Sequence, residues 1–250
     1  MFKDGVCALP GKLYTKTLEY GDINYSVAST EDQAAIFDGW SSFLNYFDAT
    51  LPFQLSFVNH RSRAEDRGRV NIPPQEDAYN SIRAEFTEML ENQIARSNNG
   101  IVRSKYITFG VPADTPADAR PRLERVEADV MGNFKRLGVQ SRPLNGAERL
   151  AVLHGQLHPG GYEPFRFSWA DIPRTGNGTK DLIAPTSFDF RQGRLFRVGS
   201  TWGAASFLQI TASELSDKLL SELLEVDTEM TVTLHVQAVD QAAAIKTIKG

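Results

Sequence analysis

Cysteine is almost absent from this chain of 250 residues, in which Cys7 stands alone. A single cysteine excludes an internal disulfide and fits a reducing compartment. The sequence also lacks any apolar run near the ~18 residues that a membrane-spanning helix needs. The apolar run before Pro10 is too short for the core of a secretory signal peptide. We therefore expect a cytoplasmic chain.

A large excess of basic charge is missing as well. The 27 Lys and Arg residues are outnumbered by 31 Asp and Glu residues, which gives a formal net charge of −4. Nucleic-acid binding depends mainly on cationic contacts to phosphate, so the whole chain has no general attraction to nucleic acid. A local basic patch stays open. A hydrophobic content of 41% is ordinary for a globular protein, and 250 residues leave room for one large domain or two small ones.

Alternating apolar residues predict strands in the first half of the chain, and apolar residues three and four apart predict helices. Two strands are expected at 13–20 and 23–27, joined by a tight turn. A helix is expected over 29–48, with Thr30 and Gln33 as its capping box. Its apolar stripe consists of Phe37, Trp40, Phe43, Leu44 and Phe47.

Further elements follow in an order that alternates strands and helices. We expect a strand at 53–57, a helix over 79–94, a strand at 100–110, a helix that carries Leu123 to Leu137 with Pro121 near its start, a short strand around Val139 and a helix over 147–157. Residues 158–186 are rich in proline and glycine, which is typical of an irregular connection.

The last part of the chain repeats the plan of the first. Strands are expected at 195–199 and 204–210, a helix over 211–224 with Thr211 and Glu214 as a capping box, and a strand at 231–237. This predicts an α+β fold of repeated ferredoxin-like split βαβ units. The units are expected at 11–157 and 187–250, with an irregular crossing loop at 158–186. The helix that follows Asp240 stops after about two turns at Gly250, so we expect a second unit that is truncated and a chain that is a piece of a longer protein.

The stretch TGNGTKD at 175–181 has the ingredients of a phosphate-binding loop but not its spacing. Such a loop needs glycines one and six residues before the lysine, and a hydroxyl after it. Around Lys180 those positions hold Thr179, Arg174 and Asp181. We interpret this stretch as a turn and expect no nucleotide site there. Lys12 fails in the same way.

Two other motifs suggest catalysis but depart from the required pattern. GSTWG at 199–203 has Thr201 where a nucleophile elbow needs serine, and it leads toward a strand, so a hairpin turn is the interpretation. HGQLH places His154 and His158 one helical turn apart, the spacing that lets two imidazoles share a metal. Gly155 stands where a zinc protease needs glutamate, so exposed or hydrogen-bonded histidines are the alternative.

The remaining candidates are a basic loop, an aromatic segment and two isolated histidines. The arginines of this loop are Arg61, Arg63, Arg67 and Arg69, which could contact phosphate or acidic lipid. Acidic residues lie between them, which favours an exposed loop. Trp169 could anchor a partner or pack internally. His60 and His235 have no visible partner, and His235 is expected on the polar face of its strand.

Eight phrases, in this order, resemble one family over residues 11–249. They are YTKTLEYGDINY, FLNYFDATLPFQLSF, NNGIVRSKYITFG, RPRLERVEADVMGNFKRLGV, ERLAVLHGQLHP, PFRFSW, TKDLIAPTSFDF and VDQAAAIKTIK. The resemblance is to the amino-terminal region of TraE/VirB-type conjugal transfer ATPases of type IV secretion, especially those of Gram-positive mobile elements. In that family, a carboxy-terminal P-loop motor follows a region that docks onto membrane components of the channel.

The resemblance implies a non-catalytic docking and assembly region at the cytoplasmic face of the cell membrane. Expected partners are inner-membrane channel subunits, the protein's own carboxy-terminal motor and, as a possibility, further copies of the chain. ATP and magnesium are expected only in the motor, and no catalytic, cofactor or metal-binding residue carries over. Two alternatives stay open: a module that binds single-stranded DNA through the arginine loop and exposed aromatics, and an enzyme that uses His154 and His158.

Overall fold

A computed structural model describes most of the chain. The described residues are 1–23, 25, 27–61, 72–73, 75, 77–97, 101–158, 164–170, 172, 176, 178–191, 193–207, 218–239 and 244–246. They form two compact units. The first comprises Met1–Ser56, Lys105–Ser213 and Thr233–Gly250, and the second comprises Phe57–Ser104 and Glu214–Val232. These bounds differ from the two units expected at 11–157 and 187–250.

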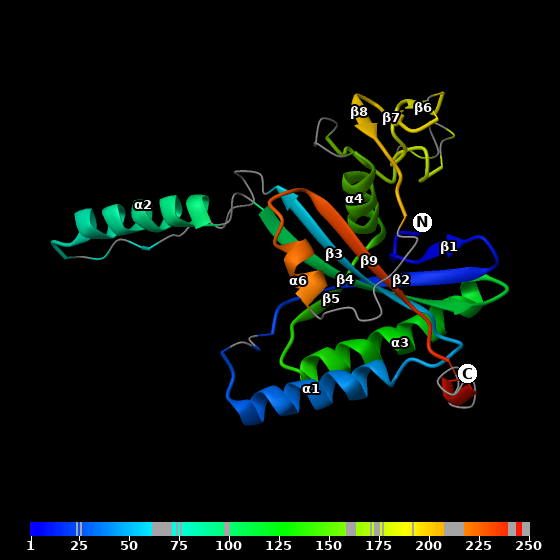
Figure 1. The fold of residues 1–250 in the computed structure, drawn as a ribbon, viewed down its shortest axis with the longest axis horizontal. Helices are drawn as coiled ribbons and strands as arrows, with labels where there is room; N and C mark the ends of the chain where they lie inside the picture. The colour runs from blue at the N-terminus through cyan, green and yellow to red at the C-terminus, as the bar shows by residue number, and fades with distance from the viewer. Residues whose placement is uncertain are drawn as a thin grey trace. The chain divides into compact units, whose positions relative to one another are not determined.

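The larger sheet has six strands and gives the protein its α+β character (Figure 1). Its strand order is β1-β2-β4-β3-β9, and β5 also pairs with β2. The strands are β1 (Cys7–Leu9), β2 (Leu13–Tyr20), β3 (Phe53–Arg61), β4 (Ile101–Pro112), β5 (Ser141–Pro143) and β9 (Met230–Val236). β2 is antiparallel to β1, β4 and β5, with Leu18 opposite both Ile107 and Pro143.

In the first unit, one face of this sheet is covered by α1 (Thr30–Leu44) and α3 (Pro116–Arg136), which run side by side (Figure 1). The apolar stripe predicted from Leu123 to Leu137 is confirmed through Phe134, because Leu123, Val126, Val130 and Phe134 are all buried, whereas Leu137 is the C-cap and is only partly buried. Thr115 caps the helix by accepting a hydrogen bond from the Asp118 amide. The helix therefore begins at Pro116, and Pro121 lies within it.

Phe134 occupies the centre of this core. Its ring stacks on Tyr20 with centroids 4.8 Å apart and contacts Phe43 at 4.9 Å. Phe47 in turn stacks on Phe53 at 4.0 Å. Of the stripe predicted for the first helix, Phe43 and Phe47 are buried, whereas Phe37 and Leu44 are exposed. The two exposed positions correct the prediction that the whole stripe packs inward.

Two local predictions in this region are wrong. The described residues of 23–27 form no strand, because β2 already pairs with β1 and β5 along one edge and with β4 along the other. The capping box of the first helix is not built on Thr30 either. Ser29 is the N-cap and accepts from the Asp32 amide, and Gln33 donates to the carbonyl of Ala28.

The other helix of the first unit, α4 (Gly146–Leu157), is confirmed almost to the residue. Asn145 and Glu148 form its capping box, in which Asn145 accepts from the Glu148 amide and Glu148 accepts from the Asn145 amide. The described residues of 158–186 form an irregular connection, as expected. The short strand predicted around Val139 begins two residues later, as β5.

A second, three-stranded sheet follows in the same unit, with the order β6-β7-β8 (Phe188–Asp189, Phe196–Val198 and Thr201–Gly203). The turn at Gly199 joins β7 to β8, which confirms the hairpin. The second strand was wrongly placed at 204–210, because it ends at Gly203 and residues 204–207 have no regular structure. The predicted capping box at Thr211 and Glu214 lies outside the described residues.

The second unit contains α2 (Asn80–Ser97) and α6 (Lys218–Leu224). α2 confirms the helix predicted from 79–94. The carbonyl of Leu224, at the end of α6, accepts from the buried Asn59 amide at 2.9 Å and from the Arg103 guanidinium. These donors stabilise the negative end of the helix dipole. None of the helices in the described part of the chain has the length and apolar composition needed to cross a membrane.

Candidate functional site

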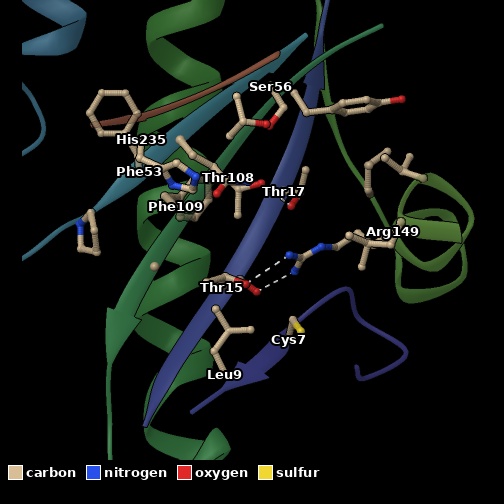
Figure 2. Close-up of a pocket in the computed structure, with 18 of the residues that line it drawn as sticks. Cys7, Leu9, Thr15, Thr17, Phe53, Ser56, Thr108, Phe109, Arg149 and His235 are labelled. Atoms are coloured by element: carbon tan, nitrogen blue, oxygen red, sulfur yellow. Dashed lines mark hydrogen bonds between the residues drawn. The ribbon is translucent and has the colours of Figure 1, made fainter. Parts of the chain in front are cut away.

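A cavity of about 450 Å³ lies in the first unit, on the face of the sheet opposite α1 and α3 (Figure 2). The sheet forms one wall, and α4 forms another through Val152, Leu153 and Gln156. Leu9, Leu13 and Phe53 add apolar surface. The volume falls within the range of about 300–1,000 Å³ that is usual for small-molecule sites.

Hydroxyl groups line the sheet wall of the cavity. They belong to Thr15 and Thr17 of β2, Ser56 of β3, Thr108 of β4 and Thr233 of β9. The hydroxyls of Thr17 and Thr108 are hydrogen-bonded across two strands at 2.8 Å, and those of Ser56 and Thr233 at 3.2 Å. Small hydroxyl side chains leave space above the sheet that a larger residue would fill.

The charged group of the cavity is Arg149, which extends from α4 toward β2 (Figure 2). Its Nη1 donates to the Gly5 carbonyl at 2.5 Å and to the Thr15 carbonyl at 2.8 Å, and its Nη2 donates to the Thr15 hydroxyl at 3.1 Å. The side chain is only 8% exposed. None of the described carboxylates forms an ion pair with it.

Burial explains the electrostatics of Arg149. Removal from water is the main influence on this guanidinium and lowers its pKa to about 10. A buried cation normally has an anionic partner, since desolvation of an unpaired charge costs several kcal/mol. Here the acceptors are two carbonyls and a hydroxyl, all of them neutral.

The local sequence explains why the guanidinium lies at this point. β1 and β5 pair with different parts of the same edge of β2. Directly after β5, the Leu144 amide donates to the Thr17 carbonyl at 3.0 Å. Gly146 then starts α4 against the amino-terminal segment: a Cβ there would lie 2.0 Å from the Phe2 carbonyl oxygen. Arg149 is thereby held over β2 in the first turn of the helix.

The two histidines of HGQLH lie at the far end of α4. Their rings stack with centroids 3.8 Å apart, and His154 is buried against Phe165 at 5.1 Å. Nδ1 of His158 lies 2.8 Å from the His154 carbonyl oxygen. No third metal ligand joins them, since the described residues contain no group of three or more His, Cys, Asp or Glu that could hold a metal ion.

TGNGTKD forms a turn, as interpreted, within its described residues. The Gly178 amide donates to the Asp181 carboxylate at 2.7 Å, and the Thr179 hydroxyl accepts from the amino terminus at 3.2 Å. Thr201 begins β8. Trp169 packs edge-on against Phe167 and lies close to Gly146, so part of its ring is internal. Arg61 ends β3, while Arg63, Arg67 and Arg69 lie outside the described residues.

Sequence reasoning missed the cavity almost entirely. Cys7 contributes to its lining, and among the candidate site residues that the structure describes, only His235 does so, from an exposed position on β9. His60 lies near the end of β3. Thr15 and Thr17 gave no clear signal, because Lys16 lies between them and Glu19 follows on the same face, as in a strand that meets water.

Two surfaces outside the cavity expose apolar side chains. Tyr79, just before α2, and Ile82, Phe86 and Met89 of α2 are 61%, 59%, 48% and 49% exposed. On the three-stranded sheet, Phe188 and Trp202 are exposed, and the flanking Phe190 and Phe207 are exposed too. The guanidinium of Arg197 lies over the Trp202 ring, 5.7 Å from its centroid.

No family model matches the chain, and no curated protein matches it significantly.

Proposed function

We propose that this chain is the non-catalytic docking and assembly region of a conjugative DNA-transfer ATPase of the type IV secretion class. The eight sequence phrases support the family, and the exposed apolar stripe of α2 supports a docking role. The α+β architecture is compatible with ferredoxin-like βαβ units, and their repetition is part of the proposal. ATP and magnesium would bind to a motor region beyond these residues.

The stripe of α2 consists of Ile82, Phe86 and Met89, and Tyr79, one residue before the helix, continues it at a spacing of three. Residues so spaced lie on one side of a helix. Single exposed apolar residues are common on protein surfaces, but an aligned row is typical of a helix that packs on another element. Such a row fits a protein partner, and channel subunits at the cytoplasmic face of the membrane are the partner that we propose.

The amino-terminal end of this helix is held by polar contacts. Arg83 donates from Nη1 to Asp77 at 2.5 Å and to the Asn80 side chain at 2.9 Å. These bonds turn the long Arg83 side chain back toward the start of the helix. These contacts fix the first turn of the helix from which the stripe extends. In the proposal, a partner bound to the stripe would be mechanically coupled to the motor through this chain.

The test is recovery of channel subunits by the full-length protein, with a matched pair of variants. Phe86→Glu places a charge within the stripe, and Ala84→Glu places the same charge on the opposite side of α2. We expect Phe86→Glu to lower recovery at least about tenfold, as loss of a central anchor does, and Ala84→Glu to retain it. Equal recovery by both variants, or no recovery by the unaltered protein, would contradict the proposal.

The second candidate function is binding of single-stranded DNA, and the three-stranded sheet favours it. Exposed aromatic rings offer stacking surfaces, and Arg191, Arg194 and Arg197 offer cations for phosphates. Base stacking is worth about 1–3 kcal/mol per base. Trp202→Ala would therefore weaken binding to an oligothymidine by roughly tenfold or more, with a steep dependence on salt. An absence of binding at low ionic strength would remove this candidate.

A further inference from the structure

The cavity combines a buried cation with apolar walls, and this combination selects a class of ligand. We propose that it binds a small amphiphilic carboxylate, with the carboxylate at Arg149 and the apolar body along Val152, Leu153 and Leu13. The inference is independent of the docking proposal, because it rests on the first unit alone.

The guanidinium of Arg149 has hydrogen-bond donors left for a ligand. A guanidinium has five N–H groups. Both hydrogens of Nη1 and one of Nη2 are used in the bonds to Gly5 and Thr15. The Nε hydrogen and the second Nη2 hydrogen have no acceptor among the described residues. Two such donors on one edge match the two oxygens of a carboxylate.

The second step concerns charge. The described surroundings of Arg149 supply carbonyl and hydroxyl oxygens but no carboxylate, so the positive charge is buried without compensation. An anion that enters the cavity would neutralise it in a site of low dielectric, where the attraction is stronger than in water. The site thus discriminates by charge: an anion is favoured over an alcohol or an amine of the same shape.

The third step concerns the body of the ligand. Aliphatic side chains of β1, β2 and α4 supply apolar lining, together with Phe53. Polar groups also line the cavity, from Gln54, Tyr106, Gln156 and His235. The Thr17 hydroxyl is hydrogen-bonded to that of Thr108, and the Ser56 hydroxyl to that of Thr233. These hydroxyls therefore offer few hydrogen-bond donors to a ligand. An inorganic anion would leave the apolar walls without contact. A carboxylate on a short apolar chain would satisfy both parts.

The experiment compares three ligands with the same eight-carbon body: octanoate, octanol and octylamine. Binding to the intact chain is measured by titration calorimetry and by the shift in Tm. We expect octanoate to bind roughly 10–100-fold more tightly than octanol. This ratio corresponds to the usual free energy of hydrogen bonds to a charged group. At 100 times its Kd, octanoate should raise the Tm by about 5–10 °C. Octylamine should give no shift.

Variants separate a ligand site from a purely structural arginine. Arg149→Met keeps the length of the side chain and should abolish the preference for octanoate over octanol. Arg142→Met, a matched change in an exposed ion pair with Glu148, should retain it. If Arg149→Met fails to fold, Leu153→Trp fills the cavity while keeping the guanidinium, and it should reduce octanoate binding at least about tenfold.

Three results would overturn the inference. The first is equal affinity for octanoate and octanol, which would indicate an apolar cavity without charge selection. The second is no saturable binding of octanoate at millimolar concentration. The third is unchanged octanoate binding in both Arg149→Met and Leu153→Trp.

Discussion

On β2, the side chains of Tyr14, Leu18 and Tyr20 face α1 and α3, while those of Thr15 and Thr17 face α4 and the cavity. The first face is filled by aromatic and aliphatic groups, with rings in contact from Tyr20 through Phe134 to Phe43. The second face has small hydroxyls, one buried cation and open volume. A strand can thus support a closed core on one side and a ligand-sized space on the other.

The two faces of β2 contribute to stability in different ways. Closed packing stabilises through apolar area removed from water, about 25 cal/mol per Å². The cavity face leaves part of that stabilisation unrealised, since an unfilled volume forgoes contacts. A protein that retains such a face while the other face is well packed has an arrangement suited to binding. Matched substitutions on the two faces should therefore change the stability by different amounts.

The largest expected effect comes from leucine deletions on the two faces. Leu123→Ala removes a fully buried side chain of α3 and should lower the free energy of unfolding by about 3–5 kcal/mol. Leu153→Ala, on the cavity wall of α4, should lower it by only about 1 kcal/mol, because the neighbouring space already exists. Chemical denaturation of both variants measures this. Equal losses would mean that the two faces are packed alike.

A smaller effect is expected where α4 meets the amino-terminal segment. Gly146→Ala would place a Cβ 2.0 Å from the Phe2 carbonyl oxygen and 2.7 Å from the Trp169 ring. We expect a loss of about 1–3 kcal/mol from overpacking. Gly155→Ala is the control within the same helix: nothing lies within 4 Å of its Cβ, so a gain of about 0.5–1 kcal/mol is expected. Thermal unfolding distinguishes the signs.

The smallest expected effect is on the pH dependence of the free energy of unfolding, which reports how far water is excluded from the closed face. Burial raises the pKa of Tyr20 to about 12. The unfolded chain ionises tyrosine near pH 10, so the folded state holds the proton longer and the free energy of unfolding falls as pH rises from about 10 to 12. Tyr20→Phe should reduce this fall by up to about 2 kcal/mol.

Tyr46 provides the comparison for that measurement. Its pKa is also raised to about 12, by burial and by its hydrogen bond to Asp129, but the residue lies closer to solvent. Tyr46→Phe should therefore change the alkaline fall less than Tyr20→Phe does. Denaturant titrations at pH 9 and pH 11.5 suffice, and an identical fall in all three proteins would show that Tyr20 is not in a dry environment.

Local patterns predicted what depends on local physics. The stripe from Leu123 to Phe134 and the helix expected over 147–157 follow from helix periodicity, and both are confirmed. Strand pairing depends on contacts between distant parts of the chain. The turn after Tyr20 therefore suggested a hairpin, whereas β2 pairs with β4 some ninety residues later.

The cavity could not be predicted for a similar reason. Thr15 and Thr17 have the same alternation whether their face meets water or a helix. Arg149 belongs to a helical stripe with Val152 and Gln156, a pattern that is equally typical of a long side chain with its head in solvent. Only the approach of α4 to β2, imposed by Gly5 and Gly146, decides that the guanidinium is buried.

In the proposed function, this chain acts by binding a protein partner through α2. Site-specific photo-crosslinking in cells that carry the complete transfer system tests it most directly, with the crosslinking residue at Phe86 or, as the control, at Ala84. The account predicts an adduct with an inner-membrane channel subunit from position 86 and none from position 84. No adduct with a channel subunit from position 86, or equal adducts from both positions, would contradict it.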